Sequence, residues 1–279
     1  MESITLRNGV EMPKIGYGVF QISKDDCARC VREAIETGYR HIDTAQSYFN
    51  ESEVGDGIAQ SGIDRADLFV TTKIWISNYG YENTLKSVEV SLRKLKTDYL
   101  DLVLLHQPFS DYYGAWHALE KLHREGVVRA IGVSNFYPDR LVDLALHADV
   151  VPAVDQIEVN PFDQKNESLK WAAKYGVQVE AWAPFAEGRG GLFTNPELTA
   201  IGENHGKSVG QVVLRWLIQR GIVPISKTTR KERMVENLNL FDFQLTPDEM
   251  AAIAKLDTAT SQFFDHRTPE SVEYVAKLH

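Results

Sequence analysis

The sequence has few features of secreted or membrane-spanning proteins. Its 279 residues include only two cysteines. Nowhere do about 18 apolar residues follow one another, which is the length that a transmembrane helix needs. The first ten residues, MESITLRNGV, have neither the charged start nor the apolar run of a signal peptide. We therefore expect a cytoplasmic protein with no membrane partner.

Basic charge is also scarce. The chain has 30 Lys and Arg residues against 39 Asp and Glu residues, which gives a formal net charge of -9. Nucleic-acid binding relies on clustered Lys and Arg side chains, so we expect no nucleic-acid partner. Any anion that this protein binds must be held by a local group of basic residues.

The two cysteines, Cys27 and Cys30, have the CxxC spacing of a redox dithiol or of half a zinc site. Positions i and i+3 share one face of a helix, and no second cysteine pair completes a tetrahedral site. The pattern therefore favours two helical cysteines without a redox or metal role, and we predict no metal site.

The usual nucleotide-binding loops are missing. Gly16 and Gly18 lack the third glycine and the βα context of the Rossmann fingerprint. The segment GENHGKS, residues 202–208, is one residue short of a Walker A loop and lies between helical segments, which predicts a helix stop and restart.

Short apolar, strand-forming runs are what the chain has in abundance. Eight of them alternate with segments of helical periodicity, at residues 15–18, 39–42, 68–72, 101–105, 130–133, 153–156, 177–182 and 222–225. This alternation predicts βαβ units and a parallel sheet. Eight units without a linker favour a single domain over residues 1–279, a (β/α)8 TIM barrel, with an open doubly wound sheet as the competitor. Asn8-Gly9, between Ile4–Leu6 and Val10–Met12, predicts an N-terminal β-hairpin.

Polar residues end most of these runs. The carboxyl ends of barrel strands share one face, where active sites lie, so these side chains are candidates for function. They are Asp43, Lys73, His106, Ser134, Asn135, Gln156, Trp182, Ser226 and Lys227, with Tyr48 just beyond Asp43.

Five blocks of the sequence resemble the aldo-keto reductase family, and they span nearly the whole chain. They are GYRHIDTAQSYFNESEVG, LDLVLLHQP, GVSNF, VDQIEVNP and KTTRKERMVEN. The branch that the chain looks most like contains the bacterial 2,5-diketo-gluconate reductases and the prostaglandin F synthase-like enzymes. The resemblance implies a barrel enzyme that reduces aldehydes and ketones with NADPH, and we expect a monomer.

The resemblance also implies a catalytic tetrad of Asp43, Tyr48, Lys73 and His106. Carbonyl reduction delivers a proton to oxygen, and a free phenol with a pKa of ~10 is a reluctant donor near neutrality. Lys73 would supply a neighbouring positive charge, Asp43 would hold the ammonium, and His106 would orient the carbonyl. The competing interpretations are a structural ion pair for Asp43 and Lys73, a half-buried aromatic for Tyr48 and a core histidine for His106.

The family pattern further implies cofactor-binding residues. Ser134, Asn135 and Gln156 would hold the nicotinamide carboxamide, and Trp182 would stack on the ring. The 2′-phosphate end would fall on Lys227, Thr228, Arg233, Glu236 and Asn237, with Arg233 able to make a bidentate contact. A solvated basic helix start is the alternative for this segment.

Several positions depart from the family. Ser226 stands where a proline usually precedes the lysine, Gln107 where a tryptophan often follows the histidine, and Phe49 where a glycine commonly follows the tyrosine. Phe20 and Trp75 remain as apolar walls beside Tyr48 and His106 in the substrate site. The brief tail predicts a wide, open pocket. Two other functions stay open: a non-catalytic NADPH-binding protein and a metal-dependent barrel hydrolase.

Overall fold

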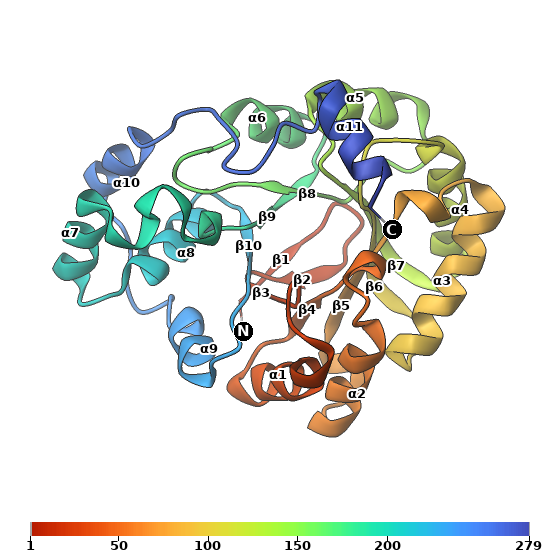
Figure 1. Ribbon diagram of the computed structural model, residues 1–279, viewed down its shortest axis with the longest axis horizontal. Coiled ribbons are helices and arrows are strands. Elements are labelled where there is room, and N and C mark those ends of the chain that lie inside the picture. Colours follow the sequence, from red (N-terminus) through yellow and green to blue (C-terminus); the bar gives the residue numbers. More distant parts are fainter. Residues whose placement is uncertain (1, 279) are drawn as a thin grey trace.

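A closed barrel of parallel strands forms the centre of the molecule (Figure 1). The computed structural model describes residues 2–278. Its strands follow one another around the barrel as β10-β3-β4-β5-β6-β7-β8-β9. They are β3 (Gly16–Gly18), β4 (His41–Asp43), β5 (Phe69–Ile74), β6 (Leu100–Leu105), β7 (Val128–Ser134), β8 (Val154–Glu158), β9 (Gln178–Trp182) and β10 (Val223–Ser226).

The predicted barrel is confirmed, and the open sheet is excluded by its closure. β10 pairs with β3, with Ile225 opposite Gly16, so the last strand returns to the first. Each of the eight apolar runs contains most of one strand. Parallel strands buried on both faces read as continuous apolar runs, which is why the sequence located them.

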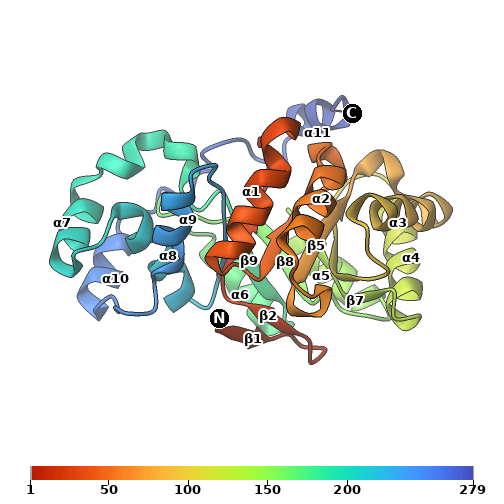
Figure 2. The ribbon, with the colours of Figure 1, turned by 90° about the horizontal axis from the view of Figure 1, so that it is seen from below.

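Helices surround the barrel and connect its strands (Figures 1 and 2). They are α1 (Lys24–Thr37), α2 (Glu51–Ser61), α3 (Tyr81–Leu95), α4 (Tyr112–Arg124), α5 (Pro138–His147), α6 (Asn166–Lys174), α7 (Pro196–His205), α8 (Val209–Gln219), α9 (Lys231–Leu238), α10 (Pro247–Ala254) and α11 (Pro269–Ala276). The predicted stop and restart near residue 206 is confirmed. Gly206, at a φ of 63°, ends α7, and Ser208 begins α8 with a capping box to Gln211.

The predicted hairpin is present and closes one end of the barrel. β1 (Ser3–Thr5) and β2 (Glu11–Pro13) pair antiparallel. Leu6 and Met12 of this hairpin join a buried apolar cluster with inward side chains of the barrel, including Phe69 and Leu104. Figure 2 shows the hairpin at one end of the molecule and α11 at the other. The polar side chains of the barrel therefore lie above an apolar floor.

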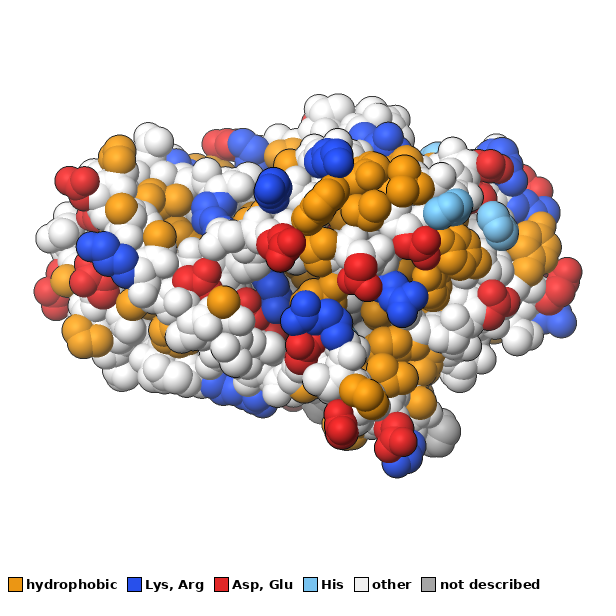
Figure 3. All heavy atoms as spheres, turned by 90° about the horizontal axis from the view of Figure 1, so that it is seen from above, with side chains coloured by type: hydrophobic (Ala, Val, Ile, Leu, Met, Phe, Trp, Pro, Cys, Tyr) orange, Lys and Arg blue, Asp and Glu red, His pale blue; other side chains and the backbone are white. Residues whose placement is uncertain are grey.

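The remaining predictions concern features outside the barrel mouth. Cys27 and Cys30 are both free and buried on α1. Within residues 2–278, no group of three or more His, Cys, Asp and Glu side chains is arranged to hold a metal ion. No helix in that range has the length and apolar character to cross a membrane. On the face in Figure 3, basic and acidic side chains are interspersed.

Candidate active site

Four side chains predicted to form the site meet at the mouth of the barrel. Asp43 ends β4, Lys73 lies near the end of β5 and His106 directly follows β6. Tyr48 lies in the short 3-10 helix η1 (Gln46–Tyr48), which follows β4. Asp43, Lys73 and His106 are buried, whereas Tyr48 is only partly buried. The strand ends therefore carry the charges, and the loop brings the phenol to them.

Lys73 is the centre of this group. Its Nζ donates hydrogen bonds to Asp43 Oδ1 at 2.6 Å, to the Thr44 carbonyl oxygen at 3.0 Å and to the Tyr48 hydroxyl at 3.2 Å. These three acceptors use all three ammonium hydrogens. The ammonium is thus fixed against the phenol oxygen by the two other contacts.

Burial and charge act in opposite directions on this group. Burial disfavours the ammonium, but Asp43 and Tyr48 outweigh that effect and raise the pKa of Lys73. Burial also raises the pKa of the Tyr48 phenol, and the charge on Lys73 offsets only part of that rise. Without the lysine, the partly buried phenol would release a proton still less readily.

His106 is neutral, and its Nε2 makes no hydrogen bond to the residues 2–278 that the structure describes. Burial, and then the charge on Lys73, hold its pKa well below the usual value. Ser47 Oγ lies 3.3 Å from Nδ1, and a hydroxyl that donates there leaves the proton on Nε2. The ring stands edge-on to Trp75, with centroids 5.1 Å apart, and 5.8 Å from the Tyr48 ring. A neutral hydrogen-bond donor therefore lies beside the phenol.

The second predicted group, Ser134, Asn135, Gln156 and Trp182, is also brought together. Asn135 donates from Nδ2 to the His106 carbonyl oxygen at 3.1 Å and accepts from Trp182 Nε1 at 2.9 Å. Ser134 Oγ donates to the Gln156 carbonyl oxygen at 2.7 Å. Asn135 has a φ of 62°, a conformation that Asn tolerates better than most residues. These contacts join the group to the tetrad through His106.

The third predicted group lies away from the barrel interior, on the loop after β10 and on α9. Its members are Lys227, Thr228, Arg233, Glu236 and Asn237. Lys227 and Arg233 are exposed, and Arg233 Nη1 donates to both carboxylate oxygens of Glu236 at 2.7 Å. The Thr228 carbonyl oxygen accepts from the Tyr17 hydroxyl at 2.6 Å, which ties this loop to β3. Asn237 is buried.

The predicted substrate walls flank the tetrad. The Phe20 ring lies 4.9 Å from the Tyr48 ring, and Trp75 is almost fully buried. Trp75 Nε1 donates to the Leu278 carbonyl oxygen at 3.0 Å. The tail therefore reaches the site, and the wide opening expected from its brevity is narrowed on this side.

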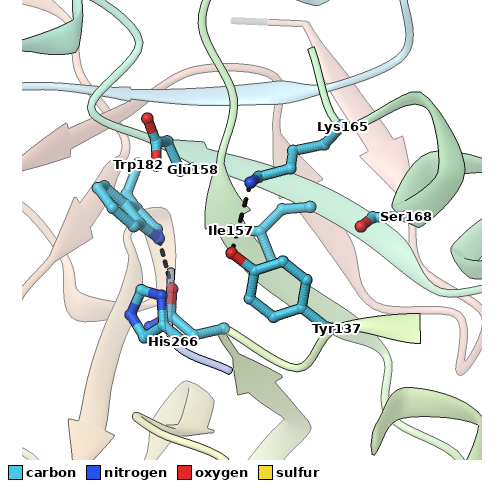
Figure 4. Close-up of a pocket in the computed structure, with 8 residues that line it drawn as sticks. Tyr137, Ile157, Glu158, Lys165, Ser168, Trp182 and His266 are labelled. Carbon is cyan, nitrogen blue, oxygen red and sulfur yellow. Dashed lines mark hydrogen bonds between the residues drawn. The ribbon is translucent and has the colours of Figure 1, made fainter. Parts of the chain in front are cut away.

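His266 lies at the barrel mouth, where the tail places it, although no sequence pattern singled it out. It lies beside Trp182, with ring centroids 6.3 Å apart, and Figure 4 shows both at one small cavity. That cavity is lined by Asn135, Tyr137, Ile157, Glu158, Lys165, Ser168, Trp182 and His266. His266 is buried, its Nδ1 has no partner within residues 2–278, and burial lowers its pKa to about 4. Nothing in the local sequence predicts this placement, because the tail forms no strand of the barrel.

Glu180 was missed as well. It lies on β9, two residues before Trp182, and is completely buried inside the barrel. The Gln156 amide donates to it at 2.9 Å. The only sequence signal was an acid in the apolar run VQVEAW, whose inward direction depends on the register with β8.

Comparisons with known proteins agree with this geometry. The chain is 45% identical over 258 residues to a glyoxal reductase of Bacillus subtilis, covering 92% of this chain and 93% of that protein. A solved structure provisionally described as 2,5-diketo-D-gluconic acid reductase B superposes with a TM-score of 0.89 at 38% identity, over 96% of this chain and 94% of that one. An aldo-keto reductase of Bombyx mori in complex with NADP gives a TM-score of 0.90 at 36% identity, over 94% and 95% of the two chains.

The family assignment rests on most of the sequence as well as on the mouth of the barrel. The sequence profile described as "Aldo/keto reductase family" matches residues 9–258, a range that contains all four tetrad residues. With the closed barrel and the relatives above, this match shows that the chain belongs to the aldo/keto reductase family.

Proposed function

We propose that this protein reduces aldehydes and ketones to alcohols with NADPH, and that Tyr48 is the proton donor. The observation that carries the proposal is the 3.2 Å contact between the Lys73 ammonium and the Tyr48 hydroxyl, with Asp43 fixing the ammonium from the other side. A structural ion pair alone does not require a phenol at that position.

Each tetrad residue has a separate task in this reaction. When bound, NADPH supplies the hydride that adds to the carbonyl carbon. The Tyr48 hydroxyl gives its proton to the carbonyl oxygen, and Lys73 stabilises the phenolate that remains. His106 Nε2 donates a hydrogen bond to the same oxygen, a type of contact commonly worth about 2.7–4 kcal/mol. Asp43 keeps the ammonium charged and in place.

The residues at the mouth fit a nicotinamide. Gln156 uses its Nε2 hydrogens on Asp43 and on Glu180, while its Oε1 makes no hydrogen bond among the residues described. That oxygen is suited to accept from a carboxamide. Ser134 and Asn135 add polar groups, and Trp182 adds an aromatic surface. At the other end, Arg233 and Lys227 offer exposed cations to a 2′-phosphate.

The relatives support the substrate class and the cofactor. One is named a glyoxal reductase, which points to small carbonyl compounds, and a structural neighbour was solved with NADP. We propose that this chain likewise uses NADPH and accepts several small aldehydes and ketones, since the apolar side chains of Phe20 and Trp75 flank Tyr48 and His106.

The direct test is NADPH consumption with a generic aldehyde, followed by absorbance. Wild type is expected to oxidise NADPH, and Tyr48→Phe is expected to lose turnover by about 10²-fold or more while still binding NADPH. Tyr113→Phe, on α4, removes another partly buried hydroxyl remote from the tetrad and serves as the control. Near-normal turnover of Tyr48→Phe would remove Tyr48 from the proton-donor role.

The same assay separates the two alternatives. A non-catalytic NADPH-binding protein would bind NADPH without oxidising it when the aldehyde is added. A metal-dependent hydrolase would leave NADPH unoxidised, whereas carbonyl reduction by the tetrad is expected to consume NADPH and to continue unchanged in a chelator.

A further inference from the structure

A second buried carboxyl group lies against the tetrad from inside the barrel. It belongs to Glu180 on β9, whose side chain has no solvent exposure. The Gln156 Nε2 atom donates to Glu180 Oε2 at 2.9 Å and to Asp43 Oδ2 at 2.9 Å. One amide group therefore links Glu180 to the aspartate that holds Lys73.

The charges around Glu180 do not balance if it is ionised. The titratable groups that face it are Asp43 and His41 on β4, Lys73 on β5 and, beyond Lys73, Tyr48. Lys73 is the only cation among them, and it contacts Asp43 at 2.6 Å. A second unpaired carboxylate in so dry a place is strongly disfavoured.

His41 does not supply the missing positive charge. Burial, and then the charge on Lys73, lower its pKa to about 3, so the imidazole is neutral. Its Nε2 lies 3.0 Å from Thr71 Oγ1 but 3.7 Å from Glu180 Oε1, too far for a hydrogen bond. Burial, followed by the negative charge of Asp43, raises the pKa of Glu180 to about 8.

We propose that Glu180 is a positioning residue that carries a proton at neutral pH and fixes the amide of Gln156. By accepting from Nε2, it keeps both amide hydrogens inside the barrel and leaves Gln156 Oε1 for the cofactor. By staying neutral, it leaves Asp43 as the sole anion paired with Lys73. The part of this inference that concerns the cofactor and turnover rests on the proposed reductase function.

Ionisation of Glu180 makes it harder for the Tyr48 phenol to lose its proton. Above about pH 8 Glu180 adds a negative charge that the Gln156 amide links to Asp43, the partner of Lys73, and this charge disfavours a further negative charge on the Tyr48 phenolate. Tyr48 therefore keeps its proton to a higher pH than it would beside a permanently neutral residue. Glu180→Gln retains an acceptor for Gln156 but removes this charge.

The protonation state can be measured without any turnover. In protein labelled with ¹³C at the glutamate carboxyl carbon, one resonance is expected at the position of a neutral carboxylic acid at pH 7 and should titrate near pH 8. It should be absent from Glu180→Gln and present in Glu158→Gln, which removes another buried carboxyl group whose hydrogen bonds are to Asn160, Ser261 and Gln262. If every glutamate is ionised at pH 7, the inference is wrong.

Turnover then tests the consequence. The pH at which reduction falls off on the alkaline side, where Tyr48 loses its proton, should move down by about half a pH unit or more in Glu180→Gln. It should not move in Glu158→Gln. An unchanged or raised value in Glu180→Gln would overturn the proposed coupling to Tyr48.

The outcomes separate this inference from the proposed function. A wild type that does not reduce carbonyls refutes the reductase proposal, whereas the carboxyl titration still reports on Glu180. A wild type that reduces carbonyls while all its glutamates are ionised at pH 7 refutes this inference alone. If Glu180→Gln does not fold, the neutral-carboxyl resonance is sought in wild type and in Glu158→Gln. Its presence in both supports the inference, and its absence overturns it.

Discussion

The two ends of the proposed cofactor site are built in different ways. At the barrel mouth, Lys73 is fully buried and donates three hydrogen bonds to strand and loop residues. On α9, Arg233 is exposed and pairs with Glu236 three residues away on the same helix. The first arrangement depends on the whole barrel, whereas the second depends on one helix and its loop.

The buried group at the barrel mouth belongs to the proposed chemistry, whereas the exposed group on α9 belongs to the proposed recognition of the cofactor. A buried charge needs its partners for folding, so substitutions there change both the free energy of unfolding and turnover. An exposed charge is screened by solvent and salt, so substitutions there change affinity for an anion and leave the fold intact. Variants of the two regions should therefore differ in which measurement they alter.

The largest effect is expected from Lys73→Met. It removes the cation beside Tyr48 and leaves the buried Asp43 carboxylate without a cation, with only the Gln156 amide as its partner. This change should lower the free energy of unfolding by about 3–5 kcal/mol and reduce turnover by about 10²-fold or more. Denaturant unfolding and steady-state kinetics measure the two losses.

The double variant Asp43→Asn/Lys73→Met distinguishes the structural role of the ion pair from its catalytic role. With both charges gone, most of the stability should return while turnover stays lost. Recovery of turnover together with stability would mean that the pair is only structural.

A smaller and more selective effect is expected from Arg233→Ala. Loss of a charge-assisted contact to the 2′-phosphate should weaken NADPH binding by about 10- to 100-fold, with little change for NADH and none in melting temperature. Titration of protein fluorescence gives both dissociation constants.

Lys231→Ala is the matched control for that prediction. Lys231 begins the same helix and pairs with Glu36 at 3.3 Å, outside the predicted phosphate contacts. Equal losses for NADPH and NADH in Arg233→Ala would contradict the phosphate role.

The smallest effect concerns backbone strain next to Tyr48, the proposed proton donor. Phe49 has a φ of 57° and is 56% exposed, so its side chain gains little from packing. Phe49→Asn should raise the free energy of unfolding by about 0.5–1 kcal/mol, because Asn tolerates this conformation. Leu146→Asn, an exposed apolar residue on a regular helix, should give no gain. A loss of stability in Phe49→Asn would show that packing of the Phe49 ring stabilises the fold by more than the backbone strain destabilises it.

The sequence predicted the parts of the molecule that follow from local periodicity. Strand ends of a parallel barrel face one way, so the order of residues alone was enough to group Asp43, Lys73 and His106. The strain at Phe49 explains why glycine suits that position in the resembling family, but only the backbone reveals it.

The residues that were missed depend on long-range placement. Glu180 sits in an apolar run, and only the register between β8 and β9, with Gln156 opposite Glu180, brings it to the Gln156 amide. His266 reaches Trp182 because the tail folds across the mouth, a path that no periodic pattern encodes. Both are set by tertiary contacts between segments far apart in the sequence.

The bond between Trp75 and the Leu278 carbonyl oxygen has a practical consequence for immobilising this enzyme. A bead, fusion partner or affinity handle joined after Leu278 would transmit its pull to Trp75, which we propose as a wall of the substrate site. The β1–β2 hairpin lies at the opposite end of the barrel, where the same load would reach only the apolar floor (Figure 2). Anchoring by the hairpin end is therefore the arrangement that leaves the substrate site undisturbed.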